Sequence, residues 1–213
     1  MHLIHRGIVN KNYKENILKS FKASFKKGYG IETDIHVTKD NKFVCFHDKT
    51  LKRFFGKNKS IKNSYYGELK KISKKFNSEI PLLKDLLKIS EKKFYIFVEL
   101  KPTLKINLLK KLLLETKEYK KCVFISFIEK NIKNIIDLNK KAKVGLSFSY
   151  NAKAEIIARK ARNNHLNCLI LDKYFLGNKI IKSIKKDKYF YTIKKKREFL
   201  KYKKKYNLIF ENL

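Results

Sequence analysis

Short β-rich runs alternate with amphipathic stretches along this chain, and the alternation limits the folds open to it. Eight runs are rich in Ile, Val, Phe or Tyr: 3–5, 30–35, 94–100, 122–127, 144–147, 168–171, 189–192 and 208–210. Stretches between them have apolar residues at three- and four-residue spacing, as on one face of a helix: 17–25, 82–89, 106–114, 131–138 and 152–161. Strands that alternate with helices form parallel sheets. Eight of them predict an α/β fold, the (β/α)8 or TIM barrel.

Two features depart from a regular barrel. An extra strand-like run at 43–47 and a polar stretch rich in Lys, Asn and Ser follow the second strand, which predicts a hairpin and loop insertion there. The chain has 213 residues and stops almost at its eighth strand, whereas such barrels typically have about 250 residues. We therefore expect one domain over residues 1–213, a compact barrel with trimmed helices and a truncated C-terminal end.

The chain is strongly basic, with 53 Lys and Arg residues against 19 Asp and Glu and a formal net charge of +34. Such a field attracts nucleic acids and anionic membranes. The lysines are scattered through almost every polar stretch, and Lys, Ile, Asn and Phe are all abundant, as an AT-rich genome would produce. We therefore interpret the excess of lysine as compositional bias. Weak association with an anionic membrane remains an expectation, and no specific nucleic acid partner is expected.

Cysteine usage and hydropathy bear on the compartment. Cys45, Cys122 and Cys168 lie far apart in apolar runs, where a free thiol behaves as a small hydrophobic group, so no disulfide framework is expected. No segment approaches the roughly 18 continuous apolar residues of a membrane span, and the motif at His5 begins too early for a signal peptide to precede it. The expected localisation is cytoplasmic.

Acidic side chains occur where predicted strands end. Glu32 and Asp34 are two residues apart on one strand, so both carboxylates project from the same side of the sheet. Glu99 and Lys101 have the same spacing after the next buried run. Strand ends converge on the mouth of a barrel, where ionisable groups are typical of catalytic sites. Three clustered carboxylates need more compensating charge than Lys101 provides, and a divalent cation with oxygen ligands, Mg²⁺ or Ca²⁺, would supply it.

Two histidines, His5 and His47, also stand at strand ends. Imidazole exchanges protons near neutral pH, as general acid and base catalysis requires. Arg6 offers the guanidinium that binds phosphate through two parallel hydrogen bonds. The other histidines have no comparable neighbours and are interpreted as structural or surface residues: His2, His36 and His165.

The ordered set resembles the glycerophosphodiester phosphodiesterase family. Its motifs stand here as His5-Arg6-Gly7, Glu32-Thr33-Asp34 and His47-Asp48. Further matches in order are Glu15-Asn16, Thr38-Lys39-Asp40, Leu51, Arg53, Gly67-Glu68-Leu69, Ile80-Pro81-Leu82 and Glu99-Leu100-Lys101. The second half matches weakly: Ser126-Phe127 fits, Tyr191-Thr192 replaces Trp-Thr, and Glu211-Asn212 replaces Thr-Asp. Lys14 and Ile17 replace the family's Pro and Thr near the mouth, which bears on substrate preference more than on chemistry.

The resemblance implies a role for each matched residue. His5 and His47 are implied to be the acid–base pair, Glu32, Asp34 and Glu99 the metal ligands, and Arg6 and Lys101 the phosphate contacts. The implied reaction is metal-dependent hydrolysis of a small-molecule glycerophosphodiester to glycerol 3-phosphate and an alcohol, a step of lipid and glycerol metabolism. The sequence leaves open the alcohol, the choice of Mg²⁺ or Ca²⁺, the order of the histidines, the nucleophile (water or the substrate's hydroxyl) and the oligomeric state.

Two other functions fit parts of the sequence. A phospholipase C- or D-like lipid enzyme on the same barrel would also use two histidines and a metal, and membrane attraction would explain its positive charge. Such an enzyme calls for an apolar, membrane-inserting loop, whereas the loop 49–76 is lysine-rich. A basic nucleic-acid-binding protein is the third alternative, but no helix-turn-helix, zinc-knuckle or ribonucleoprotein-type motif is visible.

Overall fold

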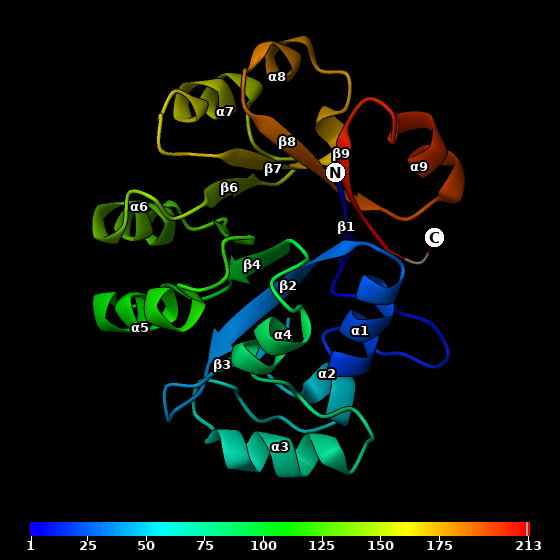
Figure 1. Ribbon diagram of the computed structural model, residues 1–213, viewed down its shortest axis with the longest axis vertical. Coiled ribbons are helices and arrows are strands. Elements are labelled where there is room, and N and C mark those ends of the chain that lie inside the picture. The colour runs from blue at the N-terminus through cyan, green and yellow to red at the C-terminus, as the bar shows by residue number, and fades with distance from the viewer. Residues whose placement is uncertain (212) are drawn as a thin grey trace.

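Eight parallel strands close into a barrel in the computed structural model, which describes residues 1–211 and 213. The strands are β1 (His2–His5), β2 (Gly30–Val37), β4 (Ile96–Leu100), β5 (Cys122–Ser126), β6 (Val144–Phe148), β7 (Cys168–Asp172), β8 (Asp187–Ile193) and β9 (Asn207–Phe210). β1 pairs in parallel with both β2 and β9, which closes the sheet. Figure 1 shows the first strand, in blue, beside the last, in red. The predicted (β/α)8 barrel is confirmed.

The predicted insertion after the second strand is also present. β3 (Phe43–Cys45) pairs antiparallel with β2, and α2 (Lys52–Phe55) and α3 (Tyr66–Lys74) follow it before the chain returns to the barrel. These elements form the lobe at the bottom of Figure 1. Its apolar residues pack on one another, with Leu51, Phe55 and Leu69 buried. Phe54 and Phe55 therefore pack within the lobe and stabilise it, and they do not form an exposed apolar loop.

Helices cover the outside of the barrel. They are α1 (Leu18–Lys26), α4 (Leu83–Ile89), α5 (Ile106–Thr116), α6 (Glu129–Leu138), α7 (Ala154–Ala161), α8 (Lys179–Ser183) and α9 (Lys196–Tyr202), with a 3₁₀ turn, η1 (Lys173–Phe175). As the chain length predicts, several of these helices are short: α8 has 5 residues, and α4 and α9 have 7 each. In the part of the chain that the structure describes, no helix is long and apolar enough to span a membrane.

The two-residue alternation along each strand separates two apolar cores. One set of side chains, including Leu3, Phe97 and Tyr189, points inward and fills the barrel. The other, including Ile31 and Ile35, packs outward against the helices. The inward residues nearer the carboxyl ends of β1, β2 and β4 are polar. The strand pattern therefore places a polar site at the carboxyl ends of the strands, and apolar side chains fill the rest of the barrel interior.

Candidate active site at the barrel mouth

A cavity of about 230 Å³ opens at the carboxyl ends of the strands. Its polar wall comprises six of the seven predicted site residues, His5, Arg6, Glu32, His47, Glu99 and Lys101. The seventh, Asp34, is fully buried and lies within ion-pair distance of Arg6 and Lys101. The structure therefore brings all seven into one place.

The register of neighbouring strands brings the three acids together. His5 on β1 lies opposite Glu32 on β2, and Asp34 on β2 lies opposite Glu99 on β4. One carboxylate oxygen from each acid lies within 4.8 Å of those of the other two. Thr33, between the two acids of β2, points to the other side and donates a hydrogen bond to Asn16 Oδ1 at 2.8 Å.

Two cations neutralise Asp34 and Glu99. Lys101 Nζ lies 2.9 Å from Asp34 Oδ1 and 2.7 Å from Glu99 Oε1, and Arg6 Nε lies 3.0 Å from Asp34 Oδ2. Burial opposes the ionisation of Asp34, but Arg6 and Lys101 hold its pKa below the usual range. Burial and the neighbouring Asp34 raise the pKa of Glu99, although Lys101 works against this shift.

Glu32 has no such cation. Its nearest basic group is His5 Nε2 at 3.7 Å, and its buried Oε2 accepts no hydrogen bond from the described residues. Burial, Asp34 and Glu99 together raise its pKa well above the ordinary value. A buried carboxylate oxygen with no partner, beside two other carboxylates, fits the ligand set of a hard divalent cation. The residues at the mouth therefore suit Mg²⁺ or Ca²⁺.

The turn after β1 shapes the site around Arg6. Arg6 and Gly7 both have positive φ, at 56° and 77°. A β-carbon on Gly7 would lie 2.2 Å from Ser20 Oγ, so only glycine fits this position. Asn16 donates its backbone N–H to the Arg6 carbonyl at 2.9 Å and its side-chain N–H to Asp34 Oδ2 at 3.2 Å. This turn fixes the arginine over the acids.

His5 has a partner that the sequence interpretation missed. Its Nδ1 lies 2.8 Å from Glu211 Oε2, just after the last strand, and Lys194 Nζ lies 2.6 Å from the other oxygen of Glu211. The hydrogen bond with His5 and the contact with Lys194 lower the pKa of Glu211 to about 2 despite its partial burial. In the resemblance to the family, Glu211 is noted only because it replaces the usual threonine. Asn212, the other residue of that departure, lies outside the described residues.

His47 is also held by a carboxylate. Its Nδ1 lies 2.7 Å from Asp48 Oδ1, and Arg53 binds both oxygens of Asp48. Arg53 also donates to Glu15 at 2.7 Å, and Glu15 accepts a bond from Arg6 at 3.2 Å, so a chain of ion pairs joins the two sides of the mouth. Burial lowers the pKa of His47 and favours its neutral form.

The rest of the cavity lining is mostly apolar. It consists of Ile125, Phe127, Ile170, Tyr191, Thr192 and Ile209, which come from β5, the residue after it, β7, β8 and β9. The Tyr191 hydroxyl donates to the Phe148 carbonyl at 3.0 Å, and its ring meets Phe127 edge to face at 6.1 Å. These contacts hold a rigid apolar surface beside the charged groups.

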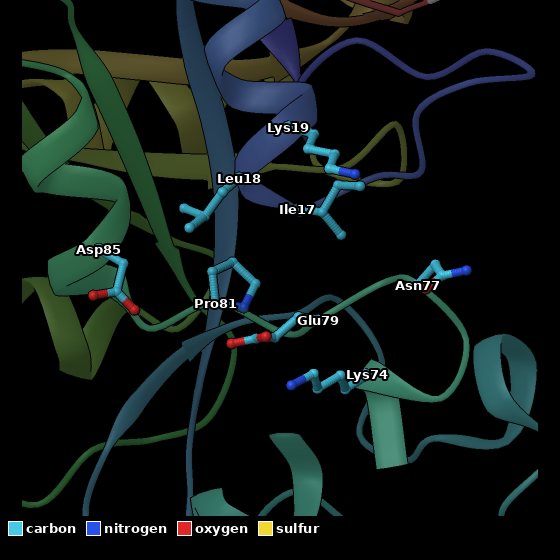
Figure 2. A pocket seen from close by; sticks show the side chains of 8 residues that line it. All are labelled: Ile17, Leu18, Lys19, Lys74, Asn77, Glu79, Pro81 and Asp85. Atoms are coloured by element: carbon cyan, nitrogen blue, oxygen red, sulfur yellow. The ribbon is translucent and has the colours of Figure 1, made fainter. Parts of the chain in front are cut away.

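A second hollow of about 320 Å³ lies on the outer side of the barrel, between the start of α1 and the segment that leads into α4 (Figure 2). Its charged groups, Lys19, Lys74, Glu79 and Asp85, are spread around the rim in Figure 2, and no histidine lines it. Glu79 is paired with Lys70 at 3.2 Å. The hollow therefore lacks a cluster of charged side chains such as the one found at the mouth.

The fold and the site define a class of protein: a (β/α)8 barrel with three clustered carboxylates and two carboxylate-held histidines at its mouth. The family model for the glycerophosphoryl diester phosphodiesterase family matches residues 5–173. The chain belongs to that family.

Individual relatives agree with this assignment. A glycerophosphodiester phosphodiesterase from Caldanaerobacter subterraneus is 29% identical over 160 residues, which cover 68% of this chain and 65% of that protein. A human lysophospholipase D is 41% identical over 69 residues, 32% of this chain and 22% of that protein. The solved structure of an Oleispira antarctica phosphodiesterase in complex with the product sn-glycerol-3-phosphate shares the fold, with a TM-score of 0.83, 21% identity, and coverage of 98% of this chain and 91% of that one.

Proposed function

We propose that this protein is a phosphoric diester hydrolase that cleaves a glycerophosphodiester to glycerol 3-phosphate and an alcohol. The observation that carries the proposal is the unpartnered Glu32 oxygen within a three-carboxylate cluster, set between two histidines in one cavity. The family supports the same reaction class, and the related Oleispira structure is of a complex with glycerol 3-phosphate.

Glu32, Asp34 and Glu99 would hold one divalent cation. When bound, the cation would polarise a phosphoryl oxygen of the diester. Arg6 and Lys101 lie beside the same acids and line the cavity. In this proposal they contact the phosphate and offset the charge that develops on it. The pocket itself is small, which suits the compact glycerol and phosphate groups.

The two histidines supply proton transfer. Each uses Nδ1 to contact a carboxylate, His5 with Glu211 and His47 with Asp48, which leaves Nε2 of each available to the substrate. One would take the proton from the nucleophile, and the other would protonate the departing alkoxide. Both assignments of the two roles are compatible with these contacts.

The proposal is tested by a matrix of metals and substrates. Glycerophosphocholine, -ethanolamine, -glycerol and -inositol are each incubated with the protein and Mg²⁺, Ca²⁺ or excess chelator, and glycerol 3-phosphate release is measured. We expect release from at least one diester with metal and none in chelator. Full activity in excess chelator, or release of a free phosphomonoester of the other alcohol, would reject the proposed reaction.

A lysophospholipid is the second candidate substrate. The human relative is a lysophospholipase D, and the cavity has an apolar wall that could accept part of an acyl-bearing glycerol group. Turnover of lysophosphatidylcholine, compared with glycerophosphocholine under the same conditions, separates the two substrate classes.

Replacing Glu211 with glutamine is expected to lower kcat by about 10- to 100-fold, the usual effect of losing a group that orients a catalytic ligand or base. The variant keeps a hydrogen-bonding group beside His5 Nδ1 but removes the negative charge of the carboxylate. We therefore expect the pH profile of kcat to shift while KM changes little. Glu211→Asp should recover part of the activity.

Glu198→Gln is the matched control for that variant. Glu198 lies on α9 and pairs with Lys173 at 3.1 Å, and among the described residues it forms no ion pair with His5 or His47. The Glu198 variant should have the wild-type kcat and pH profile. An unchanged profile in Glu211→Gln as well would show that Glu211 has only a structural role.

A further inference from the structure

Exposed aromatic residues gather on one side of the barrel mouth. Phe127 directly follows β5, Tyr150 lies two residues after β6, and Tyr174 lies in the turn after β7. Their exposed fractions are 46%, 62% and 72%. Because β5, β6 and β7 are successive parallel strands, these residues stand side by side on the rim that also bears the active site. We call Phe127, Tyr150 and Tyr174 the aromatic rim.

Further exposed apolar residues lie at the same end of the barrel as the aromatic rim. Ile106, Ile156 and Ile180 are exposed in the first turns of α5, α7 and α8. These helices run back from the mouth, so their first turns lie at the same end of the barrel as the aromatic rim. Large exposed apolar groups are costly in water, and a cluster of them beside a site marks an interaction surface.

Positive charge surrounds this surface. The segments that follow β4 to β8, 101–109, 127–134, 149–156, 172–182 and 194–199, contain twelve Lys or Arg residues against four acidic ones. Lysines occur over the whole chain, so they do not by themselves select this face. The aromatic rim identifies this face as the interaction surface, and the excess of lysine indicates that the partner is negatively charged.

We propose that the aromatic rim seats this protein on an anionic lipid surface, with the mouth facing the lipid. Tyrosine suits such a place, because its ring enters the headgroup layer while its hydroxyl stays hydrated. The lysines attract the negative surface. This inference deepens the proposed function, since it places the substrate, a glycerophosphoryl group with or without an acyl chain, at a membrane.

The geometry connects the aromatic rim to the cavity. Phe127 belongs to both, because it lines the cavity and is almost half exposed. Its ring packs against Tyr191, whose hydroxyl is fixed by Phe148. A lipid headgroup that leaves the surface therefore passes Phe127 and Tyr191, which line the same cavity as the two histidines.

The test uses the double variant Tyr150→Gln/Tyr174→Gln, because neither tyrosine lines the cavity. The matched control is Leu114→Gln/Leu200→Gln, which removes two apolar side chains of similar exposure, 66% and 50%, from the outer helices α5 and α9. Sedimentation is measured with vesicles of phosphatidylcholine alone and of equimolar phosphatidylcholine and phosphatidylglycerol. Turnover of soluble glycerophosphocholine is measured in parallel.

We expect wild type and control to bind the anionic vesicles and the tyrosine variant to bind about tenfold more weakly, with unchanged turnover of the soluble diester. Equal binding by all three proteins would overturn the proposal and assign the binding to the dispersed lysines. Absence of vesicle binding by the wild type would also overturn it. If the wild type then forms a dimer that the tyrosine variant cannot form, the surface joins two copies of the chain. If none of the three proteins hydrolyses the soluble diester, the proposed hydrolysis is rejected. The vesicle measurements still test the membrane proposal in that case.

Discussion

His5→Ala and His47→Ala are each expected to lower kcat for glycerophosphodiester hydrolysis by about 10²- to 10⁴-fold, the usual contribution of a positioned acid or base. Both histidines line the cavity, and each has one ring nitrogen held by a carboxylate. Alanine removes the proton carrier but leaves the three acids in place. KM should therefore change much less than kcat in steady-state assays of glycerol 3-phosphate release.

His165→Ala is the control for these variants, because His165 is exposed in the connection between α7 and β7, at the other end of the barrel. It should have wild-type kinetics. A diester with a nitrophenol leaving group then assigns the two roles. The departing nitrophenolate needs no proton, so the variant that lacks the general acid should recover most of its activity. Wild-type activity in either histidine variant would remove that residue from the mechanism.

The barrel could be predicted because each strand carries its own signal. Residues 96–98 and 122–125 are all apolar and buried, as the residues of strands covered on both sides must be. The prediction missed α8 and α9, which have 5 and 7 residues and bury one residue and none, so neither sequence shows a buried apolar face. α4 also has 7 residues, but it buries three leucines and was predicted. The helical state of α8 and α9 depends on contacts with the closed barrel, and a short stretch of sequence does not contain those contacts.

The acid cluster was predictable for a similar reason. Two-residue spacing places Glu32 and Asp34 on one face, and parallel pairing then sets Asp34 opposite Glu99. The partner of His5 was not predictable in this way. His5 and Glu211 are 206 residues apart, and they meet only because β1 and β9 close the barrel. The chain of Arg6, Glu15, Arg53 and Asp48 similarly joins side chains from separate turns.

Burial of a third carboxylate with only two cations implies a measurable cost in the metal-free protein. Glu32→Gln is therefore expected to raise the free energy of unfolding in excess chelator by about 1–2 kcal/mol, since it removes a buried acid that has no cation of its own. The same change should abolish most of the stabilisation by Mg²⁺ or Ca²⁺ and lower activity by at least about 100-fold. Urea unfolding with and without metal measures both effects.

The pH dependence of this effect has a definite sign. Burial and the neighbouring acids raise the pKa of Glu32, so the folded metal-free protein keeps a proton there that the unfolded chain has lost. The stability of the metal-free wild type should therefore fall as pH rises from the ordinary glutamate pKa through the raised one. Metal binding should release protons over the same range and strengthen with pH. Calorimetry in buffers of different ionisation enthalpy counts those protons.

Glu118→Gln provides the comparison, because Glu118 is exposed and lies 3.9 Å from Lys92 at its nearest contact. It should retain the wild-type response to metal and to pH. Glu32→Gln should show a flatter pH profile of stability and release fewer protons on metal addition. If the Glu32→Gln variant instead keeps full stabilisation by the cation, Glu32 is not a ligand. The unpartnered oxygen of Glu32 would then have to be satisfied by the substrate or by a basic group of the site.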